Sequence, residues 1–274
     1  MFPDTLKLGP LHLHPYGVLL ALAFLFALWF SGAKIRKRAN VGQGVILDIF
    51  QIILISSIFG ARFFFVAFHW EFFADNPLRV FAIWEGGMTL YGGILLPVLT
   101  IGYYVRKKGL SFLDVSDGVA PSLAMGIAIG RVGCFLRGCC FGLPTDSPLG
   151  MHFPEGSEAS ETGRQLMLEH GHHFADLPAS PLLHPSQLYS AFGALIIFVL
   201  VLLVEKAVKF RGAMFAEFLT LYGIHRILMD RFRWYDSASS GFWGLTVSQW
   251  VSVGFILTGM LVWIYALKRR EAVA

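Results

Sequence analysis

The sequence predicts an all-α polytopic membrane protein with seven transmembrane helices. Hydrophobic residues make up 55% of the 274 positions and charged residues only 15%, whereas soluble domains carry about 25% charged residues. Apolar runs close to the roughly 20 residues that span a bilayer also recur along the chain. We therefore interpret residues 1–274 as a single transmembrane domain.

Seven predominantly apolar segments are expected to form the helices. Glycine interrupts most of them, which membrane helices tolerate better than soluble helices do. The N-terminal residues lack the positive start, apolar centre and small-residue cleavage site of a signal peptide, so the first segment is expected to be retained. The expected helices are residues 16–34, 45–68, 88–105, 113–131, 186–208, 213–230 and 246–267.

Basic residues follow every second expected helix. Thirteen of the 22 Lys and Arg residues come directly after the first, third, fifth and seventh helices. Because cytoplasmic loops hold the excess of basic residues, the N-terminus is expected outside and the C-terminus inside. This clustering between apolar segments explains the net charge of +4 without a nucleic-acid partner. The residues are Lys34, Arg36, Lys37, Arg38, Arg106, Lys107, Lys108, Lys206, Lys209, Arg211, Lys268, Arg269 and Arg270.

The connection between the fourth and fifth expected helices, residues 132–185, is long. It holds six acidic residues together with many Pro and Gly residues. Connections of this length are usually functional or mobile. We expect an inserted extracytoplasmic head that is folded or partly mobile.

Five charged residues lie in or close to the apolar segments. A charge at the bilayer centre costs at least about 2.5–3.5 kcal/mol. Such side chains must therefore face a cavity, pair with one another or reach the interface. They are Arg62, Arg131, Glu217, Arg226 and Asp230.

The arginines near the expected outer face indicate a phosphate site. Arg226 and Asp230 are four residues apart on one helix face, with Arg233 about one turn later. Arg131 ends the fourth expected helix beside Gly130, where the missing side chain lets a lipid headgroup or another backbone approach. Guanidinium groups bind phosphate oxygens through paired hydrogen bonds and stay charged when partly desolvated.

Two carboxylates lie near the start of the fourth expected helix, at Asp114 and Asp117. Acidic residues at this position cap a helix N-terminus and favour its dipole. Asp117 can alternatively anchor a polar contact inside the bundle, and the sequence leaves both interpretations open.

All three cysteines of the chain lie within GRVGCFLRGCCFG, residues 130–142. They are too few for a disulfide scaffold. Four interpretations stay open: substrate-facing thiols, a redox pair of Cys134 with Cys139 or Cys140, small packing side chains, or a metal site. The thiols lack the C-x-x-C spacing of zinc sites, and we expect no metal. The histidines that a metal site would draw on are His152, His172, His173 and His184.

Five sequence blocks resemble the prolipoprotein diacylglyceryl transferase family in their order and spacing. The similarity runs from about residue 13 to residue 250, so it covers most of the chain. One Gly-Arg-x-Gly match would be weak evidence, whereas five ordered blocks with a matching topology identify a member of this family. The blocks are GGMTLYGG at 86–93, VSDGVAPSL at 115–123, GRVGCF at 130–135, HPSQLY at 184–189 and LTLYGIHRILMDRFRWYD at 219–236.

The resemblance implies a seven-helix, multi-pass enzyme of the bacterial cytoplasmic (inner) membrane. Such an enzyme transfers diacylglycerol from phosphatidylglycerol to the lipobox cysteine thiol beside the signal peptide of a prolipoprotein. The product is a thioether, and glycerol 1-phosphate is released. No metal or organic cofactor is implied. We expect a monomer whose partners are membrane lipid and the prolipoprotein signal peptide.

The resemblance also implies site residues. Arg131 and Arg226 are expected to stabilise the departing phosphate, because positive charge is needed where the leaving group takes its electrons. Tyr16 matches the family's Tyr-Gly pair and is expected to orient the headgroup, and Gly142 lies where the backbone passes tightly. The expected catalytic residues are Arg131, Arg226, Asp230 and Tyr91, and the expected substrate-binding residues are Tyr16, Asp117, Cys134, Cys139, Gly142 and Arg233.

Four polar positions depart from the family pattern. The family usually has His-Gly-Gly where this chain has Tyr91 before two glycines, and that histidine is often assigned as the general base. A tyrosine with an ordinary pKa near 10 is a poor base at neutral pH. Cys134 replaces an asparagine, Cys139 replaces an acidic residue, and Asp230 replaces the longer glutamate.

Different hypotheses follow from these departures. In a divergent transferase, Asp230 or a cysteine thiolate near an arginine removes the proton from the acceptor thiol. In a non-catalytic or re-purposed paralogue, the lipid pocket is kept for a different acceptor or for none. A thiol redox protein or a metal-binding membrane protein is a further alternative. The retained arginines and the HPSQLY block favour diacylglyceryl transfer.

Overall fold

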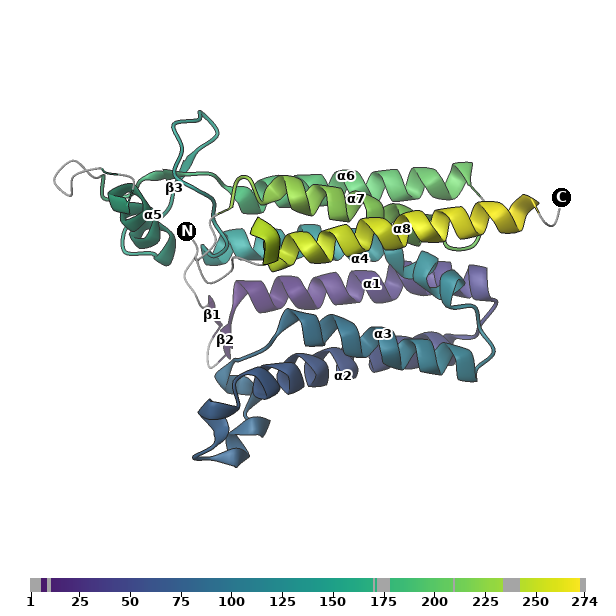
Figure 1. Cartoon of the computed structure of the whole chain (residues 1–274). Helices are drawn as coiled ribbons and strands as arrows, with labels where there is room; N and C mark the ends of the chain where they lie inside the picture. The colour runs from purple at the N-terminus through teal and green to yellow at the C-terminus, as the bar shows by residue number, and fades with distance from the viewer. Residues whose placement is uncertain are drawn as a thin grey trace. The chain divides into compact units, whose positions relative to one another are not determined.

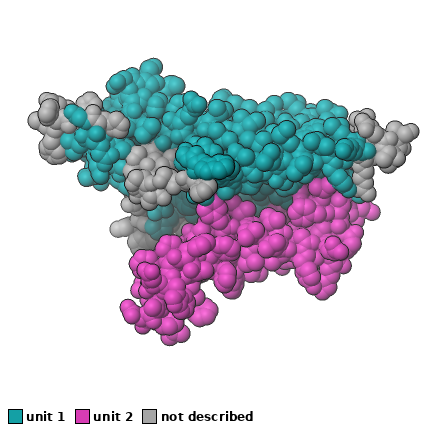
Figure 2. All heavy atoms as spheres, viewed as in Figure 1, with its two compact units in different colours: residues 1–31, 119–274 teal, residues 32–118 magenta. Residues whose placement is uncertain are grey.

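The structure is a computed structural model of the chain, and it describes residues 6–8, 11–169, 171, 178–208, 210–233 and 242–271. Within these residues there are eight α-helices and four short β-strands. The chain divides into two compact units, residues 1–31 with 119–274 (unit 1) and residues 32–118 (unit 2) (Figure 2). Both unit boundaries fall inside helices, the first and the fourth.

The helices are labelled in chain order in Figure 1. They are α1 (Pro15–Ala39), α2 (Gln43–Phe68), α3 (Leu90–Lys107), α4 (Phe112–Arg137), α5 (Glu158–Glu169), α6 (Ser186–Ala207), α7 (Ala213–Met229) and α8 (Val247–Glu271). Short 3-10 helices connect α2 to α3 and precede α8; they are Trp70–Phe73, Pro77–Phe81, Ile83–Glu85 and Phe242–Gly244. The strands form two antiparallel pairs, β1 (Leu6–Leu8) with β2 (Leu11–Leu13) and β3 (Met151–His152) with β4 (Leu182–Leu183).

The expected class, a polytopic helical membrane protein, is confirmed. Five of the described helices, α1, α2, α4, α6 and α8, are long and apolar enough to cross a bilayer. The other two expected helices correspond to α3 and α7, whose 18 and 17 residues lie at the short end of membrane spans. The remaining helix, α5, was not expected, because its sequence EASETGRQLMLE is mostly polar and gives no apolar run.

Helix α4 continues six residues beyond its expected end at Arg131. It ends at Arg137 because Gly138 adopts a left-handed φ of 77°, which glycine tolerates at a helix C-terminus. The Gly138 amide donates to the Phe135 carbonyl (3.1 Å) and the Cys139 amide donates to the Cys134 carbonyl (3.1 Å), closing the last turn. Arg131 and Cys134 therefore belong to a helix rather than to the loop.

The core of unit 1 lies where α4, α6 and α7 meet, and α7 also packs against α8. The helices α6, α7 and α8 lie side by side, with α5 and β3 beyond the end at which α6 begins (Figure 1). Apolar side chains such as Phe192 and Val199 of α6 point outward and are more than half exposed, as helix surfaces in lipid require. The buried core residues are Ala120, Ala124, Ile197, Val201, Met214, Phe218 and Leu219.

Unit 2 is organised around the pairing of α2 with α3. The two helices approach most closely at Gly60 and Gly92, where backbone meets backbone. A Cβ added to Gly92 would lie 2.1 Å from the Gly60 carbonyl oxygen, and a Cβ added to Gly60 would lie 2.2 Å from the Gly92 carbonyl oxygen. Small residues at such crossings are how membrane helices gain close packing.

Arg62 of α2 is one of the charges that the apolar pattern leaves to be explained. Its side chain is buried, and the guanidinium lies over two aromatic rings. Its nitrogens donate to backbone carbonyls of the segment before α3, so the partner of this charge is the backbone. The acceptors are the oxygens of Arg79, Val80, Gly86 and Gly87, at 2.6, 2.9, 2.6 and 3.1 Å.

The α2–α3 contact predicts opposite effects for two glycines of α3. Gly92→Ala should lower the melting temperature in detergent, because its new methyl group meets backbone atoms and overpacking costs about 1–3 kcal/mol. Gly102→Ala is the matched control, since nothing lies within 4 Å of its added Cβ. It should leave stability unchanged or raise it by up to about 1 kcal/mol through helix propensity. Equal melting temperatures for the two variants would contradict the packing.

Candidate active site

The loop after α4 is clamped between two segments that are distant in the sequence. The Gly142 amide donates to the His184 carbonyl (2.9 Å), and the His184 amide donates to the Leu143 carbonyl (3.0 Å). On its other side, the Leu143 amide donates to the Phe232 carbonyl (3.0 Å). A Cβ on Gly142 would lie 2.3 Å from that Phe232 oxygen, so only glycine fits between the start of α6 and the end of α7.

The first turn of α6 holds the same loop by two buried side chains. Ser186 Oγ donates to the Cys140 carbonyl (2.9 Å), and Gln187 Nε2 donates to the Cys139 carbonyl (2.8 Å). The HPSQLY block therefore fixes the backbone that carries two of the three cysteines.

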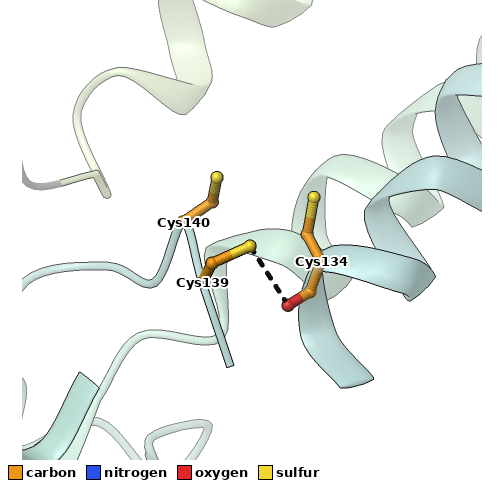
Figure 3. Close-up of side chains that lie close together, drawn as sticks. All are labelled: Cys134, Cys139 and Cys140. Carbon is orange, nitrogen blue, oxygen red and sulfur yellow. Dashed lines mark hydrogen bonds between the residues drawn. The ribbon is translucent and has the colours of Figure 1, made fainter. Parts of the chain in front are cut away.

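The three thiols converge at the end of α4 (Figure 3). Their sulfur atoms all lie within 4.8 Å of one another, and Cys139 Sγ also donates to the Cys134 carbonyl at 3.7 Å. Hydrogen bonds from Cys134 and Cys139 hold the pKa of Cys140 below its ordinary value, and the Arg233 and Arg131 charges act in the same direction. Hydrogen bonding with the other two thiols raises the pKa of Cys139. The cluster therefore holds one thiol that ionises readily.

Tyr16, in the first turn of α1, covers this end of α4. Gly133 makes room for its ring, because a Cβ there would lie 2.9 Å from Tyr16 Cδ2. The phenol is near enough to interact electrostatically with Arg131 and with all three cysteines. The structure thus brings the expected Tyr16, Arg131, Cys134 and Cys139 together.

Arg226 and Asp230 form the ion pair that their i, i+4 spacing predicts, and both side chains are largely buried. The second carboxylate oxygen of Asp230 accepts hydrogen bonds from Ser248 Oγ (2.9 Å) and Thr246 Oγ1 (3.3 Å). Both carboxylate oxygens are therefore engaged, and the Asp230 side chain is held between the end of α7 and the start of α8.

Arg131 differs from Arg226 in its partners. In the described part of the chain, no hydrogen bond or ion pair engages its guanidinium, and the side chain is half-buried. Both arginines are near enough to His225 to interact with it electrostatically, although they come from different helices. An anion near this histidine would experience the charge of both guanidinium groups.

Two other expected site residues belong to unit 2. Asp117 is fully buried and accepts a hydrogen bond from Arg38 Nη1 at 3.1 Å, so a protein guanidinium engages it. It lies in the second turn of α4 rather than at the cap, because the helix already begins at Phe112. Tyr91 lies in the first turn of α3 and is 44% exposed.

Two of the four histidines considered for a metal site, His152 and His184, have other contacts. His184 Nδ1 is 3.3 Å from the Tyr189 hydroxyl, and burial lowers the pKa of this histidine. His152 Nδ1 is 2.7 Å from the Ser180 carbonyl oxygen. His172 and His173 lie outside the described residues.

Sequence reasoning missed several polar side chains at this site. His225 places Nε2 3.3 Å from Ser190 Oγ, and it is a nitrogen base at the same helix ends as the two arginines. A signal existed, because His225 directly precedes Arg226 in a block that carries the family resemblance. Gln187 lies inside the HPSQLY block, where only its contact with Cys139 reveals its role.

Comparison with known proteins connects this arrangement to a family. A family model described as prolipoprotein diacylglyceryl transferase matches residues 3–265. Among the similar relatives is one from Proteus mirabilis (strain HI4320), which is 31% identical over 282 residues that cover 98% of this chain and 93% of the relative. A relative from Idiomarina loihiensis is 32% identical over 265 residues, which cover 95% of this chain and 91% of the relative. A relative from Synechococcus sp. (strain CC9902) is 32% identical over 281 residues, which cover 97% of this chain and 94% of the relative. All three are named phosphatidylglycerol–prolipoprotein diacylglyceryl transferase.

The clamp on the thiol loop predicts a specific effect of Gln187→Leu. Loss of its hydrogen bond leaves the buried Cys139 carbonyl without this donor, which costs about 1–3 kcal/mol. The melting temperature should fall and maleimide should label Cys139 and Cys140 faster. Gln165→Leu, at an exposed glutamine of α5, is the control and should change neither quantity. Identical labelling rates in both variants would show that Gln187 does not restrain the loop.

Proposed function

Because the chain belongs to the prolipoprotein diacylglyceryl transferase family, we propose that it transfers the diacylglyceryl group of phosphatidylglycerol to the lipobox cysteine thiol of a prolipoprotein. The single observation that supports the assignment of the site is that Arg131 and Arg226 both interact electrostatically with His225, while Asp230 pairs with Arg226 between α7 and α8. Two guanidinium groups at the ends of apolar helices fit an anionic lipid headgroup.

In the proposed reaction, the acceptor thiol gives its proton to a base, and the resulting thiolate attacks the glycerol carbon that bears the phosphate. A carbon–sulfur bond forms, the carbon–oxygen bond to phosphate breaks, and the electron pair leaves with glycerol 1-phosphate. Negative charge therefore grows on the phosphate during the step. Arg131 and Arg226 stabilise that charge, and fixed charges in a site that excludes water are more effective than charges in solvent.

Asp230 acts in this proposal as a positioning residue. One of its oxygens holds Arg226, and the other is held by Ser248 and Thr246, so the guanidinium is fixed before the lipid arrives. Pre-organised donors need no rearrangement as charge develops, which is the source of their effect on rate. Tyr16 packs on Gly133 near the Arg131 guanidinium. In this proposal its hydroxyl orients the glycerol part of the headgroup.

Seven spans with the N-terminus outside make this site extracytoplasmic. With alternating helices, the start of α1, the end of α4, the start of α6 and the end of α7 all lie on the outer side. Those four helix ends carry Tyr16, Arg131, Gln187 and Arg226, which supports the proposed orientation. The connection from the end of α4 to the start of α6 then forms the extracytoplasmic head, with Phe141, Phe153, Ala159 and Leu183 as its apolar centre. The Arg38–Asp117 pair lies at the opposite, cytoplasmic end of α4.

Removal of either arginine should abolish most of the transfer. In proteoliposomes containing phosphatidylglycerol and a lipobox peptide, Arg131→Ala and Arg226→Ala should each reduce thioether formation about 100–1,000-fold, the usual effect of losing one stabiliser of developing charge. Glycerol 1-phosphate release should fall in parallel. Arg137→Ala, an exposed arginine six residues further along α4, is the matched control and should keep normal activity. Near-normal transfer by both test variants would show that Arg131 and Arg226 do not form a phosphate site.

A separate variant distinguishes positioning from proton transfer at Asp230. Asp230→Asn should lower the rate about 10–100-fold, because Arg226 loses a charge-assisted hydrogen bond of about 1.5–3 kcal/mol. The shape of the pH–rate profile should not change. If Asp230 were the general base, its acidic limb would disappear from the profile. Asp146→Asn, at an exposed carboxylate of the head, should match the parent chain in both rate and profile.

A further inference from the structure

The three thiols have a geometry that the transfer reaction does not require. Their sulfur atoms fit within a 4.8 Å envelope, and all three side chains converge on one space at the end of α4 (Figure 3). Thiolates bound to one metal ion at about 2.3 Å lie roughly 4 Å from one another. The sulfur atoms therefore need to move by only a fraction of an ångström to surround a single ion.

The backbone that carries these thiols is held in place before any ligand binds. Cys134 lies in the last turn of α4, and Gly138 turns the chain so that the next two cysteines come back toward it. Cys140 adopts a left-handed φ of 61°, which is unusual for a residue other than glycine. Ser186 and Gln187 hold the two loop carbonyls in this conformation. Most of the conformational entropy that is lost when the three sulfur atoms come together is therefore lost on folding, before an ion binds.

The number of donors limits the kind of ion. Among the described residues, no His, Asp or Glu joins the three cysteines in this group. Zinc in structural sites takes four protein ligands in a tetrahedron, whereas thiolates without harder donors select soft ions such as copper(I). A site with three thiolates and no fourth protein ligand suits a three-coordinate soft ion.

The charge at the site favours a monovalent ion. Three thiolates around a monovalent cation carry two net negative charges. Arg131 and Arg233 both interact electrostatically with the cluster at Cys140, so positive charge is already present beside the thiolates. An ion of low charge adds less repulsion to these guanidinium groups than a divalent ion does.

From these observations we propose that Cys134, Cys139 and Cys140 form a three-coordinate thiolate site for one copper(I) ion. Binding leaves the oxidation state of copper and sulfur unchanged, and the protons of those thiols that are not already ionised are released to solvent. A disulfide is the competing outcome, but it would join only two of the three sulfur atoms. Adjacent Cys139 and Cys140 would have to close a small strained ring to form one. A single ion uses all three thiols.

Anaerobic titration of the purified, reduced chain in detergent tests this site without any lipid or peptide substrate. Copper(I), supplied in competition with a chromophoric chelator, should bind at one equivalent per chain. X-ray absorption at the copper edge should count three sulfur neighbours. One bound equivalent should also protect all three cysteines of the unmodified chain from maleimide, a readout that needs no variant. Unprotected cysteines, or fewer than three sulfur neighbours, would overturn the proposal.

Single serine substitutions measure how much each thiol contributes to the affinity for copper(I). Cys134→Ser, Cys139→Ser and Cys140→Ser should each weaken copper(I) binding by more than about 100-fold, the upper range for losing an outer-shell partner. His184→Gln is the control, because a site made only of thiolates should keep its full affinity. Melting temperatures of the metal-free variants verify folding. Retained affinity in the three serine variants, or its loss in His184→Gln, contradicts a three-thiolate site.

Discussion

Positive charge held at the ends of apolar helices is the constraint on which the proposed site depends. Arg131 and Arg226 lie in segments that are otherwise apolar, and Asp230 is the carboxylate that the structure pairs with one of them. A guanidinium group inside a bilayer is costly unless it is paired or an anion approaches it. In the proposed function, the phospholipid headgroup is that anion, and its acyl chains stay in the bilayer beside the apolar helices.

The rest of unit 1 fixes the positions of these charges. The loop after α4 lies between the HPSQLY segment and the end of α7, and it is bonded to both through backbone groups at Gly142 and Leu143. This clamp joins three helices that are far apart in the sequence. Asp230, Thr246 and Ser248 connect α7 to α8 in the same way through side chains. Displacement of one helix end would therefore shift the others. Glycine is needed at position 142 because a Cβ there would meet the Phe232 carbonyl oxygen.

Local patterns anticipated some of this arrangement. The polytopic helical class follows from apolar runs, of which five form helices long and apolar enough to span a bilayer, and the Arg226–Asp230 pair follows from i, i+4 spacing on one helix face. The helix α5 did not follow, because a short polar helix in a long connection carries no apolar run. The extension of α4 to Arg137 did not follow either, since glycines at 130 and 133 resemble a helix end, and only the packing of Tyr16 explains Gly133.

Contacts between distant residues lay outside the reach of sequence reasoning. Asp117 accepts a hydrogen bond from Arg38, which lies 79 residues away in the sequence. Arg62 donates to backbone carbonyls, and such acceptors have no sequence signature. The convergence of the cysteines depends on left-handed backbone at Gly138 and Cys140, a conformation that the spacing of the thiols does not encode.

Binding of a phospholipid headgroup by Arg131 and Arg226 is measured directly by the distance between the lipid phosphorus and the guanidinium nitrogens. Solid-state NMR of the chain in phosphatidylglycerol, with nitrogen-15 in arginine, reports this distance through phosphorus–nitrogen dipolar coupling. We expect a strong coupling equivalent to about 4 Å, the separation set by direct hydrogen bonds to phosphate oxygens, and its loss in a variant that lacks both Arg131 and Arg226. Absence of coupling in the parent chain, or equal coupling in that variant, would show that these arginines do not bind the headgroup.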